Sequence, residues 1–125
     1  MGLLSGLLGN ATEVDIDNLE KDFEGLLVEE EQIELAYKVL RDLFVFTNKR
    51  LILVDKQGLT GKKVEYHTVP YKSITRFSVE TAGRFDLDSE LRIWILGDAL
   101  PMKKEFKKGT DIIGMQKALA RYVLK

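Results

Sequence analysis

The chain has 125 residues, of which 45% are hydrophobic and 31% charged, with a formal net charge of −1 and no cysteine. This length suits one ordinary domain. The absence of cysteine excludes a disulfide framework and cysteine-based metal or redox chemistry, and it agrees with a cytoplasmic location. The near-neutral charge gives no general attraction to nucleic acid, and no apolar run approaches the ~18 residues needed to span a bilayer.

Residues 1–28 are predicted to form a helical extension. A second helix within it is expected over residues 15–24, because apolar side chains recur there at helical spacing from Ile16 to Leu27. The first helix would order only where its apolar face meets a surface, which is its own domain, a sister subunit or a membrane. That face consists of four leucines: Leu3, Leu4, Leu7 and Leu8.

Residues 29–107 change to a period of two, which predicts strands. The run 43–46 is apolar at every position, so its strand should be covered on both faces. Gly97-Asp98 is a signal for a two-residue hairpin. A twisted antiparallel sheet of this length tends to fold over into a sandwich or barrel. The seven strands are expected at residues 33–39, 43–46, 51–54, 64–68, 74–81, 91–96 and 100–106.

Residues 109–125 are predicted to form the closing helix, which begins at Thr110 or Asp111. A stripe at this spacing is more often core than a cofactor-binding surface, and here it would cover one open end of the sheet structure. The stripe consists of Ile112, Met115, Leu119 and Tyr122, with Ile113, Ala118 and Val123 beside it.

Three runs, at residues 46–55, 70–74 and 77–83, resemble the bacterial pleckstrin-homology domain family. The resemblance covers nearly the whole chain, including the leucine-rich start and the segment 104–111 that leads into the last helix. It implies a mainly β (α+β) fold, a PH-like split β-barrel of about seven antiparallel strands capped by the C-terminal α-helix. It also implies cytoplasmic homo-oligomers, and it carries over no catalytic residue. We therefore expect a single PH-like domain over residues 1–125, with the barrel at 29–107 and the capping helix at 109–125.

Pleckstrin-homology domains outside bacteria often bind phosphoinositides through basic residues around the first hairpin, and this chain departs from that pattern. Its first hairpin turns tightly at residues 39–42, and Asp98 would add an opposing charge nearby. Five basic residues on two loops can supply the convergent donors that a phosphate or lipid headgroup needs, although lysine-bearing turns are usually only solvated. They are Lys38, Arg41, Lys56, Lys62 and Lys63.

Other chemistry has little support in the sequence. His67 is the sole histidine, so a zinc site would need carboxylates to complete it. The acids from Asp86 to Glu90 lack the glycine and the final glutamate of a calcium loop. The lysines from Lys103 to Lys108 lack the interleaved aromatic residues of a nucleic-acid surface. We expect no cofactor, no metal and no enzymatic activity.

The expected function is a non-enzymatic interaction or scaffold module that assembles with itself and holds an unidentified protein partner. The reasoning is an excess of apolar surface, namely the four leucines, the face of Val45 opposite Phe44 and Phe46, and the second helix stripe. The alternative is a peripheral module that binds an anionic membrane surface through the five basic residues.

Overall fold

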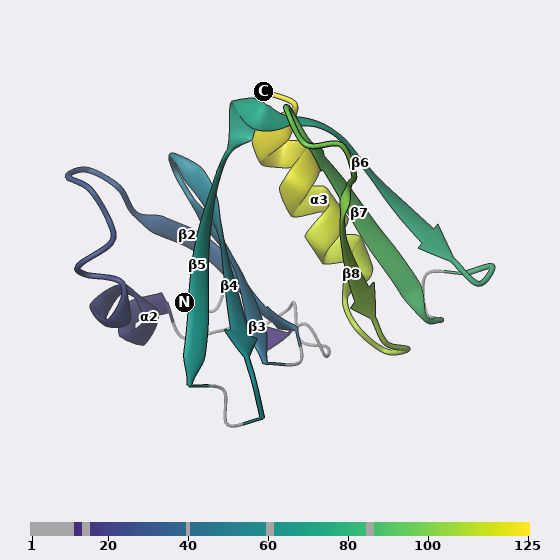
Figure 1. The fold of residues 1–125 in the computed structure, drawn as a ribbon, viewed down its shortest axis with the longest axis horizontal. Helices are drawn as coiled ribbons and strands as arrows, with labels where there is room; N and C mark the ends of the chain where they lie inside the picture. The colour runs from purple at the N-terminus through teal and green to yellow at the C-terminus, as the bar shows by residue number, and fades with distance from the viewer. Residues whose placement is uncertain (1–11, 14–15, 40, 60–61, 85–86) are drawn as a thin grey trace.

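The computed structural model describes residues 12–13, 16–39, 41–59, 62–84 and 87–125 (Figure 1). Its elements, in chain order, are β1 (Thr12–Glu13), α2 (Ile16–Asp22), β2 (Ile33–Val39), β3 (Asp42–Thr47), β4 (Arg50–Gln57), β5 (Lys63–Pro70), the short 3₁₀ helix η1 (Tyr71–Ser73), β6 (Ile74–Thr81), β7 (Ser89–Ile95), β8 (Met102–Phe106) and α3 (Ile112–Val123).

The strands form two antiparallel sheets. The first sheet has the order β1-β2-β3-β4-β5 and the second the order β6-β7-β8, and η1 carries the chain from one to the other. Helix α3 lies between the two sheets (Figure 1). The sheets do not close into a continuous barrel, so the molecule is the split barrel with a C-terminal helix that the sequence predicts. The two-residue strand β1, paired with Tyr37 and Lys38 of β2, is an addition that the sequence did not predict.

The main core, which we call the inner cluster, fills the space between the inner faces of the sheets and α3. Phe44 and Phe46 of β3 are fully buried there. The predicted helix stripe is confirmed, because Ile112, Met115 and Leu119 are at most 1% exposed. Asp111 caps α3 by accepting a hydrogen bond from the Gly114 amide at 3.0 Å. Tyr122 and Ala118 are also buried, whereas Ile113 is 46% exposed and does not join the core.

A second core, the outer cluster, covers the other face of the first sheet. Helix α2 and the turn after it pack Leu19 and Phe23 onto Val45 and Ile52. The prediction that strand 43–46 is covered on both faces is confirmed, since Val45 is fully buried in this cluster and Phe44 in the other. The face of Val45 is therefore covered within the chain and is not spare surface for assembly. The outer cluster consists of Leu19, Phe23, Ile33, Ala36, Val45, Ile52 and Val54.

A buried ion pair locks the segment between α2 and β2 to the first sheet. Arg50 Nε donates to Glu31 Oε2 at 2.8 Å, and Arg50 Nη2 donates to Glu31 Oε1 at 3.0 Å and to the Leu26 carbonyl at 2.7 Å. Glu31 also accepts from the Thr47 hydroxyl at 2.7 Å and the Val28 amide at 3.0 Å. Burial opposes ionisation of Glu31, but these hydrogen bonds and the Arg50 charge outweigh it and lower its pKa from 4.5 to about 2.

The connection between β7 and β8 differs from the predicted two-residue hairpin. Pairing of these strands ends at Ile93 with Met102, so residues 96–101 form a longer turn. Pro101 has no N–H to donate, so it cannot extend the ladder from β8. The turn leaves Leu96 and Leu100 exposed, at 72% and 79%.

Candidate functional site

The basic residues proposed from the sequence lie on two turns, or on the strand ends that flank them, at one end of the first sheet. Val39 pairs with Asp42 across the first turn, as predicted, and Gln57 pairs with Lys63 across the second. Arg41 Nη2 donates to the Gly58 carbonyl at 2.6 Å, which ties the two turns together. Gly58 has a φ of +79°, a conformation that favours glycine at this contact.

The described side chains at this end are mostly exposed and do not converge on one point where a phosphate could be enclosed. Lys38, Lys62 and Lys63 are exposed, and Lys56 is half-buried on β4. Asp42 stands among them, since its Oδ1 accepts from the Lys56 amide at 3.2 Å and its Oδ2 pairs with Lys104 Nζ at 3.2 Å. The turns are brought together, but none of the three hollows described below is lined by any of the five basic residues.

The expected opposing charge, Asp98, lies elsewhere. It belongs to the β7–β8 turn, which follows the end of β7 where Ile95 pairs with Ile74, beside η1. In Figure 1 this turn lies near the C-terminus, whereas the β4–β5 turn lies at the opposite end. The predicted leucine contact of residues 3, 4, 7 and 8 falls outside the described residues.

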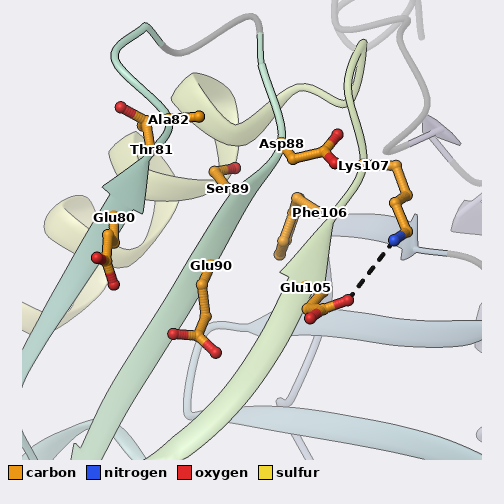
Figure 2. A pocket seen from close by; sticks show the side chains of 9 residues that line it. All are labelled: Glu80, Thr81, Ala82, Asp88, Ser89, Glu90, Glu105, Phe106 and Lys107. Carbon is orange, nitrogen blue, oxygen red and sulfur yellow. Dashed lines mark ion pairs between the residues drawn. The ribbon is translucent and has the colours of Figure 1, made fainter.

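An acidic hollow of about 340 Å³ lies at the end of the second sheet that is farther from η1 (Figure 2). Glu80, Glu90 and Glu105 are direct neighbours across its three strands. Figure 2 shows that their carboxyl groups do not converge on one point. Arg92 forms ion pairs with Glu80 and Glu90, and Lys107 lies 3.7 Å from Glu105. The residues that line the hollow are Glu80, Thr81, Ala82, Asp88, Ser89, Glu90, Glu105, Phe106 and Lys107.

The described residues of this acidic hollow do not have the arrangement of a catalytic or metal site. The Ser89 Oγ atom is buried and has no hydrogen-bond partner among the described residues. It shares the inward face of β7 with Leu91, whereas Glu90 points the other way, as the alternating burial shows. In the described part of the chain, no group of three or more acidic or histidine side chains is placed to hold a metal ion. Asp86 lies outside the described residues, and the Asp88 carboxylate accepts from the Lys108 amide at 2.7 Å.

A cleft of about 310 Å³ between the two sheets contains His67. His67 is exposed on β5, opposite Leu53 of β4. The cleft carries charges of both signs, including Asp55, Glu65 and Lys103, over an apolar floor that includes Met102. Mixed charge around one histidine gives no defined acid–base pair, so the cleft has no evident chemistry.

A third hollow, of about 480 Å³, lies at the end of the molecule where α3 ends. We call it the tyrosine–lysine hollow. The sequence placed Tyr122 on the core stripe, which is confirmed, but it gave no sign that Tyr71 of η1 would stack against it at 5.1 Å. Hydrophobic periodicity reports one element at a time, so it could not bring the two rings together. The lining consists of Lys49, Pro70, Tyr71, Lys72, Tyr122, Val123 and Lys125.

Comparisons with known proteins agree with this architecture. A family model described as "Bacterial PH domain" matches residues 2–123. The chain is 59% identical over 121 residues to the uncharacterized protein YjqA of Bacillus subtilis (strain 168), a match that covers 96% of this chain and 97% of the relative.

Two solved structures have the same fold. The pleckstrin homology domain from Shewanella amazonensis SB2B superposes with a TM-score of 0.86 at 57% identity, over 99% of this chain and 100% of that one. A DUF1696 family protein with a pleckstrin-homology domain, from Shewanella loihica PV-4, gives a TM-score of 0.78 at 59% identity, over 93% and 99%.

Two antiparallel sheets closed by a terminal helix define a PH-like split barrel. The chain belongs to the bacterial PH domain family. The described helices include none that is long and apolar enough to cross a membrane.

Proposed function

We propose that this protein is a non-enzymatic interaction module of the cytoplasm that assembles with copies of itself. The observation that carries the proposal is the free edge of the first sheet. Strand β5 is eight residues long and pairs only with β4 among the described residues. Its register with β4 runs without a bulge from Lys63 to Pro70.

An unpaired edge of this length presents a row of backbone donors and acceptors to a partner strand. Proteins usually protect such edges with bulges, proline, charged side chains or a covering element. Here Pro70 stands only at the end of the strand, and the acidic or basic residues of β5 are Lys63 and Glu65, both in its first half. Residues 65–68 are all exposed. A partner that adds a strand at this edge gains main-chain hydrogen bonds, and a second copy or another protein can supply it. The lack of cysteine agrees with a reducing compartment.

Light scattering coupled to size exclusion, at micromolar concentration, tests the self-assembly. We expect a mass of two or more times 14.3 kDa. A stable mass of 14.3 kDa across a hundredfold dilution series would refute the proposal. Affinity purification from the source cell then identifies the protein partner.

The leucine segment is proposed as a second contact. Deletion of residues 1–10 removes Leu3, Leu4, Leu7 and Leu8, and each buried leucine contributes ~1.5–3 kcal/mol. We therefore expect the deletion to shift the assembly toward smaller species in the same light-scattering experiment. An unchanged mass would remove these leucines from the contact while leaving the β5 edge to be judged separately.

The second candidate function is attachment to an anionic membrane surface, and the Arg41–Gly58 hydrogen bond favours it because it gathers the two basic turns at one end. Each lysine near such a surface contributes about 1 kcal/mol. The substitution Lys38→Gln/Lys62→Gln/Lys63→Gln should weaken binding about a hundredfold.

The assay is co-sedimentation with phosphatidylcholine vesicles, with and without phosphatidylserine, at low and physiological salt. A control variant, Lys103→Gln/Lys107→Gln/Lys108→Gln, removes the same charge from the second sheet and the segment that follows it. Membrane attachment would be refuted if the protein did not sediment with the anionic vesicles at low salt, or if the two variants lost vesicle binding equally.

A further inference from the structure

The tyrosine–lysine hollow has a rigid aromatic wall. The rings of Tyr71 and Tyr122 stack with centroids 5.1 Å apart and an angle of 18°, and Phe46 stacks on Tyr122 from the core side at 5.5 Å. The hydroxyl of Tyr71 donates to the Thr47 carbonyl at 2.7 Å, and that of Tyr122 donates to Glu34 Oε1 at 2.5 Å. Both hydroxyls are thus held by the protein, so the rings are fixed before any ligand arrives.

Both phenols remain neutral and so add no negative charge to the wall. Burial raises the pKa of Tyr71 above its ordinary value, and the neighbouring Tyr122 adds to this effect. Burial and the hydrogen bond to Glu34 raise the pKa of Tyr122 in the same direction. The Glu34 carboxylate, which accepts from the Tyr122 hydroxyl, does not line the hollow.

The charged side chains that line the hollow are all lysines. Lys49 comes from the β3–β4 turn, Lys72 from η1 and Lys125 from the residues after α3. Neither Lys49 nor Lys72 has an ion-pair partner among the described residues, and Lys125 Nζ lies 5.9 Å from the centre of the Tyr122 ring. The acidic hollow and the His67 cleft, by contrast, each contain at least three acids.

We propose that the tyrosine–lysine hollow binds a small organic anion, one that joins a flat aromatic ring to a phosphate or carboxylate group. The ligand ring packs against Tyr71 and Pro70, with Tyr122 stacked behind Tyr71, and the anionic group lies among the three ammonium groups. A volume of about 480 Å³ falls within the range of small-molecule sites. This site is at the opposite end of the first sheet from the basic turns, so it does not depend on either proposed function (Figure 1).

The test is a titration of ¹⁵N-labelled full-length protein with 1-naphthyl phosphate and with 1-naphthoate, followed by amide chemical shifts. We expect saturable shifts that centre on Lys49, Lys72 and Val123 with at least one of the two probes. Inorganic phosphate has the anionic group without the ring, and neutral 1-naphthol has the ring without the anionic group. Each should bind at least roughly tenfold more weakly. If inorganic phosphate binds as well as the naphthyl probes, the aromatic wall contributes nothing and the proposal fails.

Matched variants assign the site. Lys49→Gln/Lys72→Gln should weaken binding of the probe roughly tenfold, the order expected for partly exposed charge pairs. Lys62→Gln/Lys63→Gln removes the same charge at the other end of the sheet and should leave the affinity within about twofold. All four lysines are exposed, so both variants should retain the amide spectrum of the folded protein. Shifts that scatter over the surface, or equal losses in the two variants, would overturn the proposal.

Discussion

The substitution Glu31→Gln should destabilise the protein substantially and change how its stability depends on pH. The Glu31 side chain is fully buried in its ion pair with Arg50. Glutamine keeps the shape but removes the charge that holds the guanidinium, whose Nη2 also reaches the Leu26 carbonyl. The difference between a pKa of 4.5 and one of about 2, at about 1.4 kcal/mol for each pH unit, corresponds to about 3 kcal/mol. This agrees with the 3–5 kcal/mol lost when one partner of a buried pair is removed.

The sign of the pH dependence follows from the direction of the shift. Because the pKa of Glu31 is lower in the folded state, the unfolded state binds more protons between pH 2 and 4.5. The contribution to the free energy of unfolding is therefore complete above about pH 4.5 and is lost as the pH falls toward 2. By pH 3 about half of it should be gone. The variant should lack this part of the slope.

Urea unfolding followed by circular dichroism, at pH 7 and at intervals down to pH 2, measures both effects. A suitable control is Glu105→Gln, because the Glu105 side chain is 72% exposed in a 3.7 Å pair and should matter by less than about 0.5 kcal/mol. A loss below about 1 kcal/mol at pH 7, or equal slopes for Glu31→Gln and the wild type from pH 4.5 to 2, would refute the reasoning.

Other expected outcomes concern the turn after α2 and the start of α3. Phe23→Ala should lower the free energy of unfolding by about 3–5 kcal/mol, because Phe23 is 3% exposed and its ring meets that of Tyr66 edge to face at 5.7 Å. Urea unfolding measures this loss, and a value under about 1 kcal/mol would mean that α2 and the turn after it do not cover the first sheet. At a solvent-exposed helix position, replacing glycine by alanine raises the free energy of unfolding by about 1 kcal/mol. Gly114→Ala should not stabilise this protein, because the new Cβ would lie 2.9 Å from Asp111 Cγ and displace the capping side chain. In an Asp111→Ala background the same glycine substitution should become stabilising, and equal effects in both backgrounds would contradict the steric explanation.

Local patterns predicted the fold well. The uninterrupted apolar run around Val45 and Phe46 predicts a strand covered on both faces. The helical spacing of apolar residues from Ile112 to Tyr122 predicts the helix that closes the inner cluster. The same patterns could not say what covers Val45. A sequence shows that a face is apolar, but the identity of its cover depends on a tertiary contact, and α2 supplies it here.

Long-range polar contacts were beyond prediction for the same reason. Glu31 and Arg50 are 19 positions apart and look like ordinary surface charges in sequence. The stacked pair Tyr71 and Tyr122 depends on where η1 and α3 end in space. The basic turns were an easier case, because hairpin connectivity alone brings alternate turns to one end of an antiparallel sheet, and the contact from Arg41 to Gly58 confirms that they meet.

The separate outer cluster gives the molecule a way to open in part. Residues 16–31 are held to the first sheet by the outer cluster, by the ion pair of Glu31 and by hydrogen bonds such as that from Asn48 Nδ2 to the Glu30 carbonyl at 3.0 Å. The inner cluster and α3 lie on the other side of the sheet. Detachment of this segment is a sub-global opening, in which hydrogen exchange would quicken in α2 before α3 loses protection. The apolar outer face of the first sheet would then be exposed and could associate with neighbouring molecules. Because the Glu31–Arg50 contact opposes this detachment, we expect it to limit aggregation as well.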